Sequence, residues 1–175
     1  MPDITFAVHK LSQYVSKPCD EHWEATEKIL KYLKGTPGHG LFYSSDSNST
    51  LSIFSDADWA ACPDTRRSMT GYCLFLSSPL VSWKAKKQHT VSRSSVEAEY
   101  RAMAHATCKV VRAIALLEYF GIKVEKAVPL FCDNQVAVHI SSNPVFHERT
   151  KHIEIDCHTV REIFGRDNPT HAYTK

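Results

Sequence analysis

The stretch LSIFSDADWA at residues 51–60 decides the predicted fold. Its first five residues are apolar and β-branched enough to predict a strand, and Asp56 stands at the carboxyl end of that strand. A second apolar run, AVPLFC at 127–132, leads directly into Asp133. In open α/β sheets, ligands bind outside the carboxyl ends of the strands. Asp56 and Asp133 therefore share one site if their strands are parallel neighbours. Pro129 favours an edge strand or a strand start, because proline cannot donate to the ladder.

The longest helical pattern of the chain lies between these two runs. It extends from about Ser94 to Phe120 and is followed by Gly121, a residue type that suits the position after a helix end. Glu99 begins an apolar stripe at spacings of three and four, so it is predicted to face the core and to be a third acid of the site. Glu97 lies on another side of the helix. Its spacing from Ser94 is that of a capping box, which predicts a cap rather than a ligand.

A fourth acid is predicted near the start of a final helical pattern at 153–164, where Glu154 and Asp156 are both candidates. Several carboxylates that converge from distant positions are what a pair of divalent ions needs in order to act on a phosphodiester. Mg²⁺ prefers such oxygen ligands to imidazole or thiolate. A carboxylate on the inner side of a packed helix is also costly to bury without a partner, and a metal ion would supply one.

The remaining patterns predict an α/β protein with a mixed sheet flanked by helices. The glycine-rich segment 35–40 is predicted to link two helices at the N-terminus to the rest of the chain. In chain order, the expected elements are helices at 4–16 and 20–34, strands at 40–45, 51–56, 68–77 and 80–87, the long helix, a strand at 127–133, a helix at 134–142 and the final helix.

Several of these segments, taken together, resemble the ribonuclease H domain in the Pol polyprotein of copia-type LTR retrotransposons. The matching segments are SDADWAACPDTRRS (55–68), TGY (70–72), VSWKAKKQ (81–88), VSRSSVEAEYRA (91–102), LFCDNQ (130–135) and NPVFHERTKHIE (143–154). The resemblance implies a ribonuclease H-like fold and hydrolysis of the RNA strand of an RNA–DNA hybrid. It also implies two Mg²⁺ or Mn²⁺ ions. The implied site residues are Asp56, Glu99, Asp133 and Glu154 as metal ligands, with Asp156 as the alternative fourth acid, and His147 as an aid to product release.

Residues 2–14 and 22–36 are similar to the segment that joins polymerase and nuclease in the same polyproteins. We therefore expect residues 1–39 to be a helical remnant of that connection, with other Pol segments as partners. Residues 40–175 are expected to form the ribonuclease H-like domain, shortened at its C-terminus because the final HAYTK resembles a truncated family tail. The alternative function is a catalytically inactive retroelement relic that retains the fold and nucleic-acid binding.

The charge pattern adds candidate nucleic-acid contacts. The net charge is only +2, but basic residues gather around 84–93, and contacts of this kind position a duplex through its phosphates. An enzyme that recognises RNA in a hybrid must also detect the 2′-hydroxyl. The predicted phosphate contacts are Lys84, Lys86, Lys87 and Arg93, and the predicted 2′-hydroxyl partners are Ser95, Asn134 and Gln135.

Composition excludes several other classes of protein. The six cysteines contain no C-x-x-C pair, which argues against a structural zinc site and a disulfide framework. No segment approaches the roughly 18 apolar residues of a membrane span, and no signal peptide is visible. We therefore expect a soluble intracellular protein that has no membrane partner.

Overall fold

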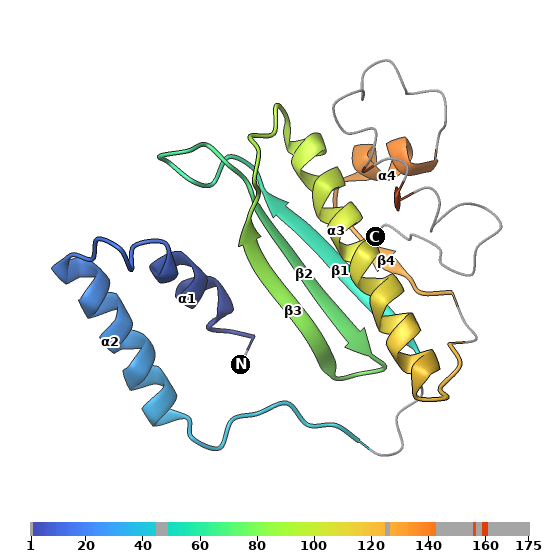
Figure 1. Cartoon of the computed structure of the whole chain (residues 1–175), viewed down its shortest axis with the longest axis horizontal. Coiled ribbons are helices and arrows are strands. Elements are labelled where there is room, and N and C mark those ends of the chain that lie inside the picture. Colours follow the sequence, from blue (N-terminus) through green and yellow to red (C-terminus); the bar gives the residue numbers. More distant parts are fainter. Residues whose placement is uncertain (1, 45–48, 125–126, 143–155, 157–158, 161–175) are drawn as a thin grey trace. The chain divides into compact units, whose positions relative to one another are not determined.

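The computed structural model in Figure 1 describes residues 2–44, 49–124, 127–142, 156, 159 and 160. The chain divides into two compact units, Met1–Tyr43 and Ser44–Lys175. Within the described residues, no helix is both long enough and apolar enough to cross a membrane.

The second unit is built on a four-stranded mixed sheet with the strand order β3-β2-β1-β4. β1 pairs with β2 and β2 with β3 in antiparallel fashion, whereas β1 and β4 are parallel. This topology confirms the predicted mixed sheet, and it places the two strands that carry the acids side by side. The strands are β1 (Leu51–Asp58), β2 (Met69–Leu76), β3 (Leu80–Lys87) and β4 (Leu130–Phe131).

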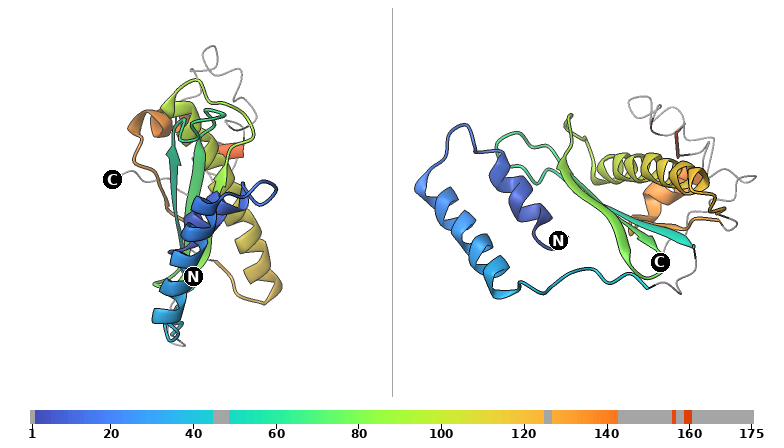
Figure 2. Two further views of the ribbon diagram at one scale, coloured as in Figure 1. Left: turned by 90° about the vertical axis from the view of Figure 1, so that its left-hand side faces the viewer. Right: turned by 60° about the horizontal axis from the view of Figure 1, so that its bottom comes forward.

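The helix α3 (Ser95–Tyr119) lies along one face of this sheet, as Figures 1 and 2 show. Burial alternates strictly along β1, with Leu51, Ile53, Ser55 and Ala57 buried and the residues between them more exposed. The buried set therefore faces α3, because side chains on a strand alternate between its two faces. The main core cluster between the helix and the sheet comprises Leu51, Ile53, Leu74, Tyr100, Met103, Ala104, Ala106, Val110, Val128, Leu130, Cys132, Ala137 and Val160.

Both ends of α3 are fixed by capping interactions that the sequence predicts. Ser94 accepts a hydrogen bond from the Glu97 amide through its side chain, and Glu97 in turn accepts one from the backbone amide of Arg93. At the other end, Gly121 adopts a left-handed φ of +77°. Its amide bonds to the carbonyl of Glu118, and the following amide bonds to the carbonyl of Leu117, which is the Schellman arrangement.

Two predicted strands differ from the structure. β4 contains only two paired residues where a strand at 127–133 was expected, because Pro129 has no amide hydrogen and takes part only through its carbonyl, which accepts from Ile53. The strand predicted at 40–45 is wrong over its described residues, since 40–44 form no ladder. A short apolar run gives no information about whether a pairing partner exists for it.

Beyond β4, Asn134 begins the helix α4 (Gln135–Ser142) by accepting a hydrogen bond from the Ala137 amide at 3.0 Å. This is the N-cap interaction that asparagine favours. The helix contacts α3. The final helix predicted at 153–164 falls almost wholly outside the described residues, of which 156, 159 and 160 are helical.

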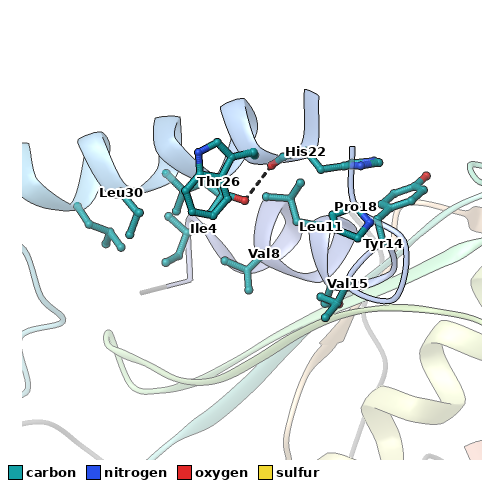
Figure 3. A pocket seen from close by; sticks show the side chains of 13 residues that line it. Ile4, Val8, Leu11, Tyr14, Val15, Pro18, His22, Thr26 and Leu30 are labelled. Carbon is teal, nitrogen blue, oxygen red and sulfur yellow. Dashed lines mark hydrogen bonds between the residues drawn. The ribbon is translucent and has the colours of Figure 1, made fainter. Parts of the chain in front are cut away.

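The first unit consists of α1 (Thr5–Ser12) and α2 (Asp20–Gly35), neither of which contains a fully buried residue. The two helices enclose an apolar cavity of about 440 Å³, shown in Figure 3, which Val8 and Leu11 line from α1 and Leu30 from α2. Tyr14 stacks on His22 at one end, with 4.1 Å between ring centroids. Two helices alone bury too little apolar surface to form a closed core.

Candidate metal centre

The parallel pairing of β1 and β4 sets Asp56 and Asp133 at the same level of the sheet. Phe54 pairs with Phe131, and each aspartate lies two residues further along its strand direction. Asp56 is in the last part of β1, and Asp133 directly follows the buried Cys132. The requirement that the two strands be parallel neighbours is therefore met.

Glu99 reaches this level from the first turns of α3. Its side chain is 6% exposed and accepts hydrogen bonds from the backbone of Ala57 and, at 3.9 Å, from the Cys132 thiol. Ligand atoms of Glu99, Cys132 and Asp133 all lie within 4.8 Å of one another. Three of the predicted acids thus converge at the carboxyl ends of β1 and β4, with Glu99 and Asp133 in closest approach and Asp56 beside them.

The electrostatics of Glu99 show that this arrangement lacks positive charge. Burial, together with the negative charges of Asp56 and Asp133, raises the pKa of Glu99 to about 7, against the opposing effect of the hydrogen bonds from Ala57 and Cys132. A carboxyl group with such a pKa is only partly ionised at neutral pH. A cation bound between the three acids would favour the charged form.

Cys132 identifies which cation the donor set fits. Burial raises the pKa of its thiol to about 11, so without a bound metal ion the sulfur carries its proton at neutral pH. A protonated thiol is a hydrogen-bond donor and not a metal ligand. The remaining donors are carboxylate oxygens, which suit Mg²⁺ or Mn²⁺ better than zinc.

A buried polar network that the sequence did not predict supports the start of α3. Gln88, at the end of β3, is 6% exposed. Its amide nitrogen donates to Thr70 at 2.9 Å and to the carbonyl of Ala98 at 3.1 Å, and its oxygen accepts from Ser92 at 2.8 Å. The network ties the sheet to the residue that precedes Glu99. Residue type alone gave no sign of it, because glutamine after a run of lysines is typical of an exposed strand end.

The fourth acid and the histidine stay predictions. Glu154 and His147 lie outside the described residues. Asp156 is half-buried, and burial raises the pKa of its carboxyl while the charges of Arg101 and His105 oppose that shift. Arg101 and His105 follow Glu97 at intervals of four along α3, so Asp156 interacts with a different side of the helix from Glu99.

The predicted nucleic-acid contacts are all at least partly exposed. Lys84 and Lys86 project from β3, and Lys87 donates to the thiol of Cys62 at 3.6 Å. Arg93 and Ser95 are exposed at the start of α3, and Gln135 is exposed directly after Asn134. Their role in binding stays a prediction.

The mixed sheet, the helix across it and the three converging acids define a ribonuclease H-like fold. The solved structure of prototype foamy virus protease–reverse transcriptase is similar at a TM-score of 0.51 and 11% identity, covering 76% of this chain and 19% of that chain. The N-terminal ribonuclease H domain of a Mycobacterium tuberculosis protein gives a TM-score of 0.49 at 12% identity, covering 72% of this chain and 81% of that chain. At 11% identity, the similarity to the foamy virus structure supports the fold alone.

Sequence relatives identify the family. The chain is 43% identical over 160 residues to the retrovirus-related Pol polyprotein from transposon RE2 of Arabidopsis thaliana, and 44% identical to that from transposon RE1. It is 38% identical over 162 residues to the corresponding polyprotein of transposon TNT 1-94 from Nicotiana tabacum. These matches cover 91–93% of this chain but only 11–12% of the relatives. No family model matches. The chain belongs to the retrovirus-related Pol polyproteins of copia-type transposons, of which it spans about a ninth.

Proposed function

We propose that this chain is a ribonuclease H that hydrolyses the RNA strand of RNA–DNA hybrids with two Mg²⁺ or Mn²⁺ ions. The observation that carries the proposal is the convergence of Asp56, Glu99 and Asp133 at the carboxyl ends of two parallel strands. When bound to these acids, the two ions would stabilise the attacking and leaving oxygens of a phosphodiester.

The protein side chains have distinct parts in this scheme. Asp56 would bridge the two ions, Glu99 and Asp133 would complete the ligands of one, and Glu154 or Asp156 would serve the other. Glu99 can hold a cation only after it loses its proton, and its pKa is about 7. Metal binding and protonation therefore compete at Glu99, so affinity for the ions should rise as the pH increases through neutrality.

Recognition of the hybrid would use the residues around the acids. Arg93 and Ser95 flank the start of α3, on the helix that supplies Glu99, and Asn134 follows Asp133 directly. The Asn134 side-chain oxygen already caps α4, which leaves its NH₂ group to donate to a ribose 2′-hydroxyl. These contacts would select RNA in the strand nearest the acids.

The test is cleavage of a labelled RNA–DNA hybrid by the purified chain with Mg²⁺ or Mn²⁺. Asp133→Asn should reduce cleavage by more than the roughly 10- to 100-fold that loss of an outer-sphere partner of a metal ligand costs. A chelator should abolish cleavage. Asp64→Asn is the matched control, because Asp64 is an exposed acid in the turn before β2 and should be replaceable without effect.

Hybrid cleavage that survives both Asp133→Asn and the chelator would contradict the proposed site. Absence of cleavage by folded wild-type protein would contradict the enzyme itself. In that case, retained affinity for the hybrid would favour the inactive relic that keeps only binding.

A further inference from the structure

A small cavity of about 50 Å³ lies between the β2–β3 hairpin and α3, apart from the three acids. Tyr72 on β2 pairs with Lys84 on β3, and Thr70 pairs with Lys86. These side chains face the side of the sheet that α3 covers, because Tyr72 and Thr70 also pair with the buried Ser55 and Ala57 of β1. His105 closes the cavity from α3, and His89 lines it beyond the end of β3.

The cavity concentrates positive charge. Burial lowers the pKa of His105, and the charges of Lys84, His89 and Lys86 lower it as well. Asp156 acts in the opposite direction, but it also interacts with Arg101. Among the described residues, the salt bridges involve neither Lys84 nor Lys86. The basic groups thus repel one another around one cavity, and an anion would relieve that repulsion.

The hydrogen-bonding groups around the cavity suit a phosphate. Two lysine ammonium groups and two imidazoles can donate to several oxygens at once, and the Tyr72 hydroxyl can donate from the sheet side. Lys84, Lys86, His89 and His105 are exposed, so a ligand attached to a larger molecule can approach. Charge-assisted hydrogen bonds of this kind are stronger than neutral ones.

Two independent measures place the cavity relative to the acids. Asp56 pairs with Gly71, and Gly71 pairs with Ala85, which stands between Lys84 and Lys86. Two strand spacings separate the backbones of Asp56 and Ala85 by about 10 Å. Along α3, His105 is six residues from Glu99, an axial rise of about 9 Å. Along the duplex axis one strand advances about 3.4 Å per nucleotide, so the cavity lies within about three nucleotides of the acids.

We propose that the cavity lined by Tyr72, Lys84, Lys86, His89 and His105 binds a backbone phosphate of the nucleic acid, within about three nucleotides of the phosphodiester at the acids. This inference rests on the proposed function, because it takes the same hybrid as its ligand. It adds Tyr72, His89 and His105 to the nucleic-acid contacts and assigns the lysines to one phosphate.

The test measures hybrid binding without turnover, in the presence of a chelator. Lys84→Ala and Lys86→Ala should each weaken hybrid binding by about 3- to 10-fold and lower the slope of log affinity against log salt by about one. Lys123→Ala is the matched control, since Lys123 is an exposed lysine beyond the far end of α3 and should have no effect. Equal losses of hybrid affinity for Lys84→Ala and Lys123→Ala would overturn the proposal, because they would indicate non-specific electrostatic attraction by surface lysines.

Hybrids that carry one uncharged methylphosphonate locate the phosphate. Replacement at one position within about three nucleotides of the cleavage position should weaken binding to wild-type protein and have no further effect on Lys84→Ala. Additive losses at every position would overturn the proposal. Titration with inorganic phosphate distinguishes a free phosphate ligand from a nucleic-acid phosphate, and NMR signals of the His105 ring report whether it binds. If inorganic phosphate shifts these signals while Lys84→Ala leaves the hybrid affinity unchanged, the nucleic-acid assignment is overturned.

These outcomes are distinguishable from failure of the proposed enzyme. A protein that binds the hybrid through Lys84 but does not cleave it would support the phosphate cavity and contradict the nuclease. A protein that cleaves the hybrid but binds it equally well after Lys84→Ala and Lys86→Ala would contradict the cavity alone.

Discussion

At the scale of single residues, Glu99 links the stability of the fold to its proposed function. Its pKa is about 7 in the folded chain against an ordinary value of 4.5, mainly because it is buried. Below pH 4.5 Glu99 carries its proton in both the folded and the unfolded chain, so it does not lower the free energy of unfolding. Between pH 4.5 and about 7, Glu99 loses its proton in the unfolded chain but keeps it in the folded chain, so the free energy of unfolding falls as the pH rises. Above pH 7 the whole loss of unfolding free energy is present.

We therefore expect Glu99→Gln to raise the free energy of unfolding at pH 8, without divalent ions, by about 1–3 kcal/mol, and to change it little at pH 4. Glutamine keeps an oxygen that accepts from Ala57 and Cys132. Urea denaturation at the two pH values measures the difference.

Glu97→Gln is the control for this prediction and should have the opposite sign. The Glu97 carboxylate is buried, lies 2.7 Å from Arg101 and caps α3, so its replacement removes a paired charge. Equal stability of wild-type protein and Glu99→Gln at pH 8 would mean that the charge of Glu99 does not destabilise the folded chain.

The sequence predicted Asp56, Glu99 and Asp133 because each follows from a local pattern: a strand end for the two aspartates and a helical stripe for the glutamate. It did not predict Gln88, because that residue is buried only through the way β3 meets α3. The raised pKa of Glu99 also depends on groups that are distant in the chain.

At the scale of elements, the sequence predicted the long helix well because both of its caps are local. Ser94 and Gly121 are residue types that begin and end helices, and each takes that role. The strand at 40–45 was wrong, and β4 is shorter than expected, because strand pairing depends on a partner far away in the chain.

Gly121→Ala tests the cap at the end of α3. The glycine has a φ of +77°, and no atom lies within 4 Å of an added methyl group, so the cost comes from the backbone alone. A left-handed conformation costs a residue with a side chain about 1–2 kcal/mol, which should appear as lost unfolding free energy.

Gly71→Ala is the matched control in β2, where φ is not left-handed and the nearest atoms are at ordinary contact distances of 3.8 and 3.9 Å. It should not reduce stability, because alanine also restricts the unfolded chain more than glycine does. Equal losses for the two variants would show that the φ of Gly121 is not what determines its cost.

At the scale of the whole molecule, the proposed site and its supporting core belong to the second unit, Ser44–Lys175. The three acids lie on β1, on α3 and two residues beyond β4, and the proposed phosphate cavity is lined by residues of β2, β3 and α3 and by those just after β3. The apolar cavity of the first unit is lined by α1, α2 and the residues next to them. The division therefore separates the proposed chemistry from the two-helix segment.

Limited proteolysis tests this division, because the segment between α2 and β1 contains exposed aromatic residues outside any helix or strand. Phe42 is 85% and Tyr43 55% exposed, and chymotrypsin has a hydrophobic specificity pocket that accepts such side chains. Tyr119 is as exposed as Phe42, but it is held in the last turn of α3 by backbone hydrogen bonds. We expect the first cut after Phe42 or Tyr43, since exposed loop positions are cleaved before hydrogen-bonded helices.

Mass spectrometry of a digestion time course identifies that first cut, and a double variant, Phe42→Ser with Tyr43→Ser, should delay it. The larger fragment should keep the unfolding midpoint that the second unit has in the intact chain, because the residues of its core cluster all lie after the cut. An initial cut beside Tyr119 would show instead that the end of α3 opens first. That result would place the weakest part of the chain next to the Gly121 cap and not between the two units.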